Sequence, residues 1–220
     1  MIKQYLNSAA LALAVATTLP AAASSFVLNF DGLADGANAN GDAVAVAHNV
    51  TFHEAQFVPD LDEFGDAIAG SEKWQPVLAG APIMARDPST FAGGVYGPAP
   101  SGTNALDVRD APVLMSFATP LDLTQFSFTL DRSTLGNPFV VDVLLLGVDK
   151  QLLASIATVQ SVSGYSGVLA TPVLGVKEIL LSTTAYYDDI SVSTVPLPAP
   201  VAMLGAAVIS LAAARRRRVD

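Results

Sequence analysis

The chain is poor in the residue types from which many catalytic and binding sites are built. Its 220 residues include no cysteine, so disulfides, thiolate metal sites and cysteine nucleophiles are excluded. Only 14% of the residues are charged, and 11 basic residues against 20 acidic ones give a formal net charge of −9. Proteins that bind nucleic acids need clustered Lys and Arg against phosphate, so we expect no nucleic-acid partner.

The motifs of common enzyme classes are missing as well. The sequence contains no G-x-S-x-G, H-E-x-x-H or S-x-x-K motif, no phosphate loop, no dinucleotide fingerprint and no EF-hand loop. The two histidines, His48 and His53, stand five residues apart and would face opposite sides of a strand, so they form no joint ligand pair. We therefore expect a protein that is not an enzyme.

A group of acidic residues leaves one enzymatic alternative open. Two carboxylates at a suitable separation hydrolyse glycosidic bonds. The acids available for such a pair are Glu54, Asp60, Asp62, Glu63, Asp66 and Glu72. Nothing in their spacing is diagnostic, and a run of acids in a loop is usually solvated. Asp62, Glu63 and Asp66 offer metal ligation as a further alternative.

The first 23 residues have the layout of a secretory signal peptide. Lys3 provides a positive start, residues 9–16 are apolar, and Ala21-Ala22-Ala23 forms a small-residue end before Ser24. We expect translocation, cleavage by signal peptidase and a mature chain that begins near Ser24. The alternative interpretation is a buried N-terminal helix.

The C-terminal segment has three parts in a fixed order. Val195-Pro196-Leu197-Pro198-Ala199 is followed by an apolar stretch from Val201 to Ala214 and then by Arg215-Arg216-Arg217-Arg218. Fourteen helical residues span ~21 Å, which is short for a hydrocarbon core of about 30 Å. The sequence predicts a short transmembrane helix over 200–214, with the arginines on the cytoplasmic side and the main domain outside.

This three-part segment resembles the PEP-CTERM class of bacterial sorting signals, in its VPLPA variant. The resemblance covers about 25 residues and departs from the commoner Pro-Glu-Pro form, because Leu197 stands where glutamate would be. It implies an exosortase-type membrane protease as a partner. It also implies passage through the inner membrane of a Gram-negative cell that makes exopolysaccharide and biofilm. An ordinary C-terminal membrane anchor is the alternative.

Residues 24–194 form the predicted domain, which is more acidic than the whole chain. It contains 6 basic and 19 acidic residues, a formal net charge of −13. Period-two alternation and short β-branched runs predict an all-β, two-sheet jelly-roll-like β-sandwich. The expected strands are 26–30, 44–52, 104–109, 113–118, 123–131, 139–146, 151–159, 165–170, 176–182 and 186–194. Residues 56–90 and 91–103 are expected to be long loops.

Three short segments resemble jelly-roll domains of the kind found in PEP-CTERM proteins and carbohydrate-binding modules. They are Asn29-Phe30-Asp31-Gly32, the run from Pro100 to Leu106, and the run from Tyr187 to Val192. The resemblance implies that the first and last strands lie side by side. It also implies that a closing aspartate joins early residues around a structural Ca²⁺.

Four aspartates are the candidate calcium ligands: Asp31, Asp35, Asp188 and Asp189. Ca²⁺ takes six to eight oxygens from carboxylates and carbonyls. Successive residues of a strand face opposite sides, so we expect only one of Asp188 and Asp189 to face the core. The alternative is that these aspartates cap turns in solvent.

The candidate sugar-binding residues are Trp74 and Tyr96, which fall in the expected long loops. Further aromatic residues that could stack on sugar rings are Tyr165, Tyr186 and Tyr187. A single tryptophan is meagre for a glycan platform, and a loop tryptophan is as often a plug that seals the end of a sandwich.

Together these features predict an exported protein that is anchored in the inner membrane before processing. It is then placed at the cell surface or in the extracellular matrix. We expect a non-catalytic role that is structural or associated with exopolysaccharide. A secreted polysaccharide hydrolase and a calcium-dependent adhesin are the alternatives.

Overall fold

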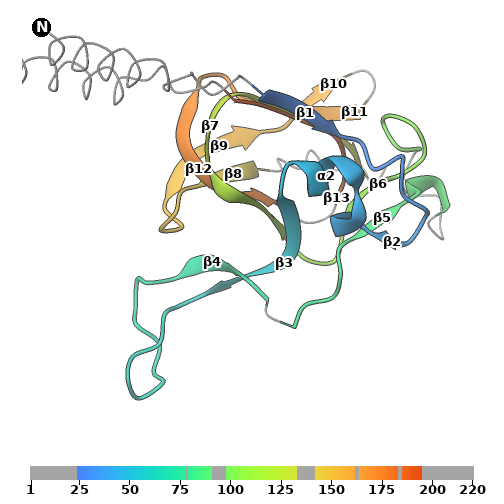
Figure 1. The fold of residues 1–220 in the computed structure, drawn as a ribbon. Helices are drawn as coiled ribbons and strands as arrows, with labels where there is room; N and C mark the ends of the chain where they lie inside the picture. Colours follow the sequence, from blue (N-terminus) through green and yellow to red (C-terminus); the bar gives the residue numbers. More distant parts are fainter. Residues whose placement is uncertain are drawn as a thin grey trace, which may run out of the picture. The chain divides into compact units, whose positions relative to one another are not determined.

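The computed structural model describes the β-rich domain that follows the predicted signal peptide. The described residues are 24–77, 79–90, 98–132, 142–161, 164–182 and 185–194 (Figure 1). The predicted signal peptide (1–23), the predicted sorting segment (195–220) and Tyr96 lie outside these ranges. In the ranges described, no helix combines the length and the apolar character needed to cross a membrane.

The all-β prediction is confirmed, because strands dominate the described residues and the helices are very short. The strands are β1 Ser24–Leu28, β2 Ala37–Asn38, β3 Val50–Val58, β4 Lys73–Pro76, β5 Met84–Arg86, β6 Ala105–Val108, β7 Val113–Arg132, β8 Asp142–Leu146, β9 Leu152–Ala157, β10 Val159–Ser161, β11 Gly164–Val168, β12 Val173–Leu181 and β13 Ala185–Thr194. The helical turns are η1 Ala39–Gly41, α2 Ala43–Ala47 and η2 Pro88–Thr90.

Strand β7 is one continuous strand of 20 residues, although the sequence pattern predicts two strands over this range. Its first half pairs with β3 and β12, and its second half pairs with β11 and β13. Val176 opposes Leu121 and Glu178 opposes Ser116, so β7 carries three extra residues between these pairs. Pro120 lies in this stretch, where a missing N–H is tolerated.

The pairings join the strands into one continuous sheet rather than two separate ones, and the bent β7 folds it into two layers in a β-sandwich-like arrangement (Figure 1). One layer contains β3, the first half of β7, β12, β8 and β9. The other contains β11, the second half of β7, β13, β6, β5 and β2. β1 pairs with β13, as the resemblance to jelly-roll domains implies.

The layers also join at a second place. β9 and β10 are separated only by Thr158, and β10 pairs with β11. The strands therefore form a closed circuit. β7 pairs with β12, β12 pairs with β8, and β8 pairs with β9. The chain then continues from β9 into β10, which pairs with β11, and β11 pairs with β7.

The core lies between the layers and follows the predicted alternation. Phe126 and Phe128 of β7 are buried, whereas Gln125 is exposed. The core includes Phe30, Phe52 and Tyr187, all fully buried. Phe128 and Tyr187 lie with ring centroids 5.4 Å apart, so aromatic contacts connect neighbouring strands inside the sandwich.

The predicted strand 44–52 is wrong in its first half, which forms helix α2. Asp42 caps this helix, because its Oδ1 accepts hydrogen bonds from the N–H groups of Val44 and Ala45, each at 2.9 Å. The alternating Val and Ala residues are also compatible with a short helix that has one buried side, because Ala45 is buried while Val46 is 61% exposed. The cap therefore outweighs the period-two pattern, and the strand begins only at Val50.

The predicted loop 56–90 is also partly wrong, because it contains the end of β3 and all of β4 and β5. β3 and β4 pair over residues 55–58 and 73–76. We call residues 55–76 the hairpin arm. Figure 1 shows the arm projecting from the body of the fold, at the lower left.

Candidate functional site

Three predicted site residues, one near the start of the domain and two near its end, meet at one short segment. The carboxylates of Asp31, Asp188 and Asp189 all bind the segment Ser101–Asn104. Asp31 Oδ1 accepts hydrogen bonds from the backbone N–H groups of Thr103 at 2.8 Å and Asn104 at 3.3 Å. The segment therefore joins the loop after β1 to the middle of β13.

Asp188 is the most deeply buried of the three, with no exposed surface. Its Oδ2 accepts hydrogen bonds from Ser101 N at 2.8 Å and Ser101 Oγ at 2.9 Å, and its Oδ1 accepts one from Asp189 N at 2.8 Å. Burial raises the pKa of Asp188 to about 6, although the hydrogen bonds from Ser101 and Asp189 oppose the shift.

Asp189 reaches the same serine because β13 is irregular at this point. Its φ of 47° is left-handed, and the register with β7 shifts between Asp188 and Ser191. Asp188 is buried and Asp189 is only half-buried, so one of the two faces the core, as predicted, although the bulge lets both carboxylates reach Ser101. Asp189 Oδ1 lies 2.9 Å from Ser101 Oγ, the same oxygen that contacts Asp188. A hydroxyl has one proton, so it donates to only one of these carboxylates at a time.

Gly102 allows Asp31 to approach the segment closely. Its φ is +52°, and a Cβ built on it would lie 2.0 Å from Asp31 Oδ1. A Cβ would displace the Asp31 carboxylate, and the left-handed φ is strained for other residues, so both steric and conformational grounds favour glycine at this position.

The group meets some requirements of a cation site but not all of them. Asn104 Oδ1 is buried without a hydrogen-bond partner, while the amide nitrogen donates to Leu33 O at 2.8 Å. Asp31, in contrast, already accepts N–H donors. In the described ranges, no three acidic or histidine side chains are placed to hold one metal ion. A Ca²⁺ ion here would have to use oxygens of Ser101, Asn104 or the backbone beside the two aspartates.

Asp35, the fourth candidate calcium ligand, accepts a hydrogen bond from a different segment. Its Oδ1 accepts a hydrogen bond from Asp87 N at 3.1 Å. This bond joins the loop after β1 to the end of β5.

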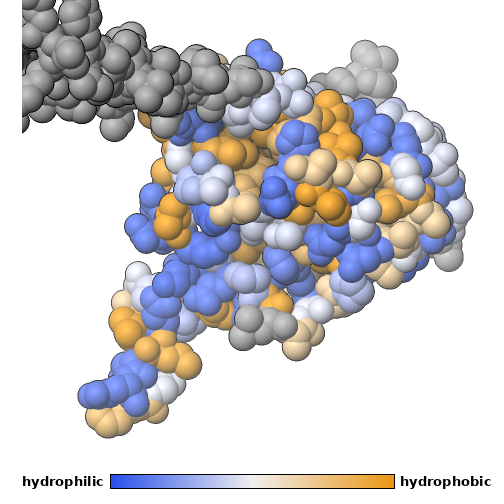
Figure 2. Space-filling view, viewed as in Figure 1, coloured by the Kyte–Doolittle hydropathy of each residue, from blue (hydrophilic) through white to orange (hydrophobic). Residues whose placement is uncertain are grey.

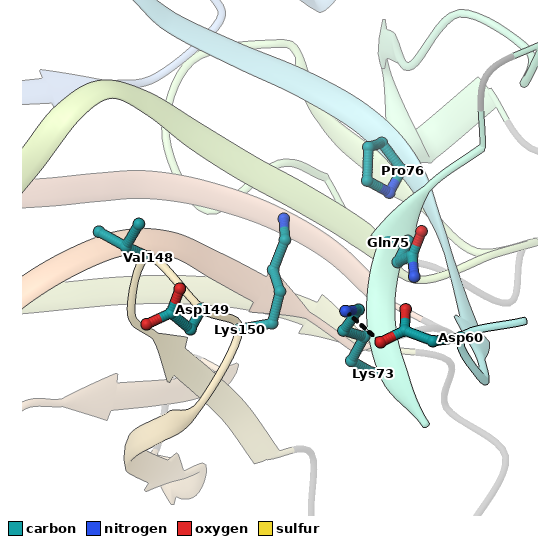
Figure 3. Close-up of a pocket in the computed structure, with 7 residues that line it drawn as sticks. All are labelled: Asp60, Lys73, Gln75, Pro76, Val148, Asp149 and Lys150. Atoms are coloured by element: carbon teal, nitrogen blue, oxygen red, sulfur yellow. Dashed lines mark hydrogen bonds and ion pairs between the residues drawn. The ribbon is translucent and has the colours of Figure 1, made fainter. Parts of the chain in front are cut away.

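A hollow of about 390 Å³ lies between the base of the hairpin arm and the β8–β9 turn (Figure 3). It is lined by Asp60, Lys73, Gln75, Pro76, Val148, Asp149 and Lys150. Lys73 Nζ forms an ion pair with Asp60 Oδ2 at 2.7 Å, and Lys150 Nζ contacts both carboxylate oxygens of Glu178. Both ammonium groups therefore face carboxylates, which makes the hollow suited to a neutral polar ligand rather than a phosphate.

Trp74 contributes to packing on the opposite side of β4 from Lys73 and Gln75. It is half-buried against a small cluster formed by Ala55, Leu114, Leu144, Leu146 and Leu180. Its ring centroid lies 5.2 Å from that of Phe57. Trp74 therefore packs on a cluster that is separate from the main core, and sugar binding by Trp74 stays a prediction.

The tyrosines near the candidate site are also occupied with packing. Tyr186 and Tyr187 are 1% and 0% exposed, so neither presents a ring face for stacking on a sugar. Tyr187 donates its hydroxyl to Ser182 O at 3.2 Å, and burial raises its pKa well above the ordinary value. Tyr165 is half-buried.

A second hollow, which the sequence analysis does not identify, has a volume of about 440 Å³. Arg86, Asp107 and Arg109 line it, together with Glu54 and Asp110. Asp107 accepts hydrogen bonds from Arg109 Nε at 2.8 Å and Nη2 at 2.7 Å, and the pKa of Arg109 is raised by this bond. The signal in the sequence is the two-residue spacing of Asp107, in β6, and Arg109, which directly follows the strand.

The acids considered for glycoside hydrolysis have separate local contacts. Asp62 Oδ1 accepts the N–H groups of Phe64 and Asp66, each at 2.9 Å. Glu54 Oε2 accepts Ala81 N at 3.2 Å, and Asp60 is paired with Lys73. His48 stacks on Phe26 with centroids 4.1 Å apart, whereas His53 lies in β3.

Comparisons of the chain with protein-family models, with curated proteins and with solved structures find no match.

Proposed function

We propose that the chain is an exported surface or matrix protein that is sorted through its C-terminal segment. The observation that carries this proposal is the order of three features: the Val195–Ala199 motif, the apolar stretch 201–214 and the Arg215–Arg218 cluster.

The sorting mechanism follows from the physical properties of the two ends. The N-terminal segment 1–23 starts translocation and is removed by signal peptidase. The apolar helix then stops translocation, while the arginines stay cytoplasmic because moving them into hydrocarbon is costly. The Val195–Ala199 motif is thereby held at the outer interface, where an exosortase-type protease reaches it.

Neutralising the arginine cluster tests this mechanism. With Arg215 to Arg218 replaced by glutamine, we expect loss of the inner-membrane intermediate and secretion or missorting of the protein, as measured by fractionation and immunoblotting. The control replaces the part-exposed Arg86 in the domain with glutamine, which leaves the segment intact. Unchanged surface display of the glutamine variant would contradict the proposal.

For the domain, the proposal is a non-catalytic module of jelly-roll-like topology that is associated with exopolysaccharide. The pairing of β1 with β13 supports the topology. The hollow at the base of the arm supports the ligand class, because its mixture of ammonium, amide and carboxylate groups suits sugar hydroxyls. A secreted polysaccharide hydrolase is the alternative from another class.

A calcium-dependent adhesin is a second candidate, favoured by one specific observation. The carboxylates of Asp188 and Asp189 share a single Ser101 hydroxyl, and Asn104 Oδ1 is buried without a partner. A cation would relieve the repulsion between the carboxylates and supply the missing partner.

A glycan array probed with the exported full chain, with and without chelator, tests both proposals for the domain. The calcium proposal predicts that chelation lowers the melting temperature by several degrees, since an ion that binds only the folded state stabilises it. Asp189→Asn should abolish this shift and Asp149→Asn should preserve it. A melting temperature that does not respond to Ca²⁺ would exclude the adhesin, and absence of glycan binding in either condition would leave a structural role.

A further inference from the structure

The hairpin arm is an ordered projection with an apolar tip. Beyond the paired part of β3 and β4, Leu61 forms a bridge with Ala67, and Ile68 N donates to Asp60 O at 2.9 Å. The side chains of Leu61, Phe64 and Ile68 are 63%, 82% and 46% exposed. Figure 2 shows apolar and hydrophilic residues intermixed along this projection, at the lower left.

Internal hydrogen bonds hold the tip in one conformation. Asp62 Oδ1 accepts two N–H groups of the turn, and Gly65 adopts the left-handed φ of +86° that the turn requires. Nearer the base, Ser71 Oγ accepts Asp60 N at 2.8 Å and donates to Ile68 O at 2.6 Å. These contacts stiffen the arm before any partner binds, which lowers the entropic cost of association.

The apolar side chains surround the tip and do not form one flat face. The bridge between Leu61 and Ala67 places Asp60 opposite Ile68, so Leu61 and Ile68 fall on opposite faces of the hairpin. Phe64 lies in the turn between them. A flat partner surface would cover only one face of the arm. To bury the apolar side chains on both faces, a partner must enclose the tip in a recess.

The negative charge of the arm indicates which kinds of partner surface can bind it. Residues 59–72 contain five carboxylates and no basic residue: Asp60, Asp62, Glu63, Asp66 and Glu72. Lys73 pairs with Asp60, and the other four acids are exposed. Anionic lipid and anionic polysaccharide are repelled by such a tip. A second copy is disfavoured as well, because residues 24–194 carry a formal net charge of −13.

We propose that the tip of the hairpin arm, centred on Phe64, docks into an apolar recess with a basic rim on a partner protein. Aliphatic Leu61 and Ile68 favour a protein surface over a sugar, because sugars stack on aromatic rings. The proposal uses only residues of the arm, so it holds or fails independently of the sorting mechanism.

Photo-cross-linking in intact producing cells tests this docking. The full chain carries p-benzoylphenylalanine in place of Phe64, or in place of Val168 as a control that is 67% exposed on β11. We expect a cross-link from position 64 to one protein, whose cross-linked peptide is rich in Lys or Arg and in apolar residues.

Substitutions next to the photoreactive residue separate docking from chance capture. Leu61→Ser should lower the cross-link yield about tenfold, because buried apolar area drives the contact. Glu63→Gln should lower it about threefold, in a salt-sensitive manner. Leu174→Ser is the matched control, since Leu174 is 66% exposed on β12, and it should leave the yield unchanged.

Four results of the cross-linking experiment would overturn the proposal. They are a yield no higher than that from position 168, a cross-link to a second copy of the chain, a lipid or polysaccharide adduct, and a cross-linked peptide without basic residues. Equal losses for the Leu61→Ser and Leu174→Ser variants would also overturn it.

Discussion

Single side chains around Ser101 illustrate how burial changes the chemistry of a residue. Asp188 has no exposed surface, and its pKa is raised to about 6 by burial. Between its ordinary value and about pH 6, the folded protein therefore binds more protons at this residue than the unfolded chain. The contribution of Asp188 to stability is largest at low pH and is lost as the pH rises through about 6.

Asp188→Asn removes this pH dependence. We expect the variant to lack the fall in stability that the wild type shows between about pH 4 and pH 6. Chemical denaturation at a series of pH values measures this difference. Asp149→Asn, at an exposed aspartate, is the control, and an identical pH profile for the Asp188→Asn variant and the wild type would contradict the assignment.

Among the elements, β7 shows how one strand serves two layers. The three extra residues that bend it leave the carbonyl groups of Phe117 and Ala118 outside the regular ladder with β12. Lys177 Nζ donates to both, at 2.6 Å and 2.8 Å. A lysine side chain thus replaces the strand partner that the bend removes.

Lys177→Met keeps the length of the side chain and removes the donor. We expect a loss of about 1–3 kcal/mol in the free energy of unfolding, because two backbone carbonyls lose a charged partner. Lys73→Met is the control, since Lys73 forms a part-exposed ion pair of the kind that contributes at most about 1 kcal/mol. Equal losses in urea denaturation would show that the bend does not depend on Lys177.

For the molecule as a whole, the connection from β9 to β10 joins the two layers a second time. Gly167 of β11 lies where the strands converge, and a Cβ at this position would lie 2.3 Å from Phe128 Cζ and 3.1 Å from Ile156 Cγ2. The absence of a side chain therefore allows β7, β9 and β11 to pack together.

Gly167→Ala tests this convergence. We expect a destabilisation of about 1–3 kcal/mol, because the methyl group displaces a buried ring in a close-packed core. Gly32→Ala is the matched control, as a Cβ at Gly32 meets nothing within 4 Å. Differential scanning calorimetry measures both, and a Gly167→Ala variant as stable as the control would show that the core has room there.

The sequence predicts features that depend on near neighbours in the chain. Alternation along β7 identifies Phe126 and Phe128 as core residues, because side-chain direction in a strand repeats every two residues. The same rule fails at Val44–Ala47, where the cap from Asp42 favours a helix. The rule holds only where the backbone stays regular.

The meeting of Asp31, Asp188 and Asp189 at Ser101–Asn104 depends on distant parts of the chain. Ser101 and Asp188 are 87 residues apart and meet through the register of β13. Asp189 reaches the same serine at the bulge, and the left-handed Gly102 leaves room for Asp31. The arm, similarly, contains strand residues that the sequence pattern assigns to a loop. Composition and periodicity act locally and select strands, whereas pairing, bulges and burial depend on contacts that form only when the whole chain has folded.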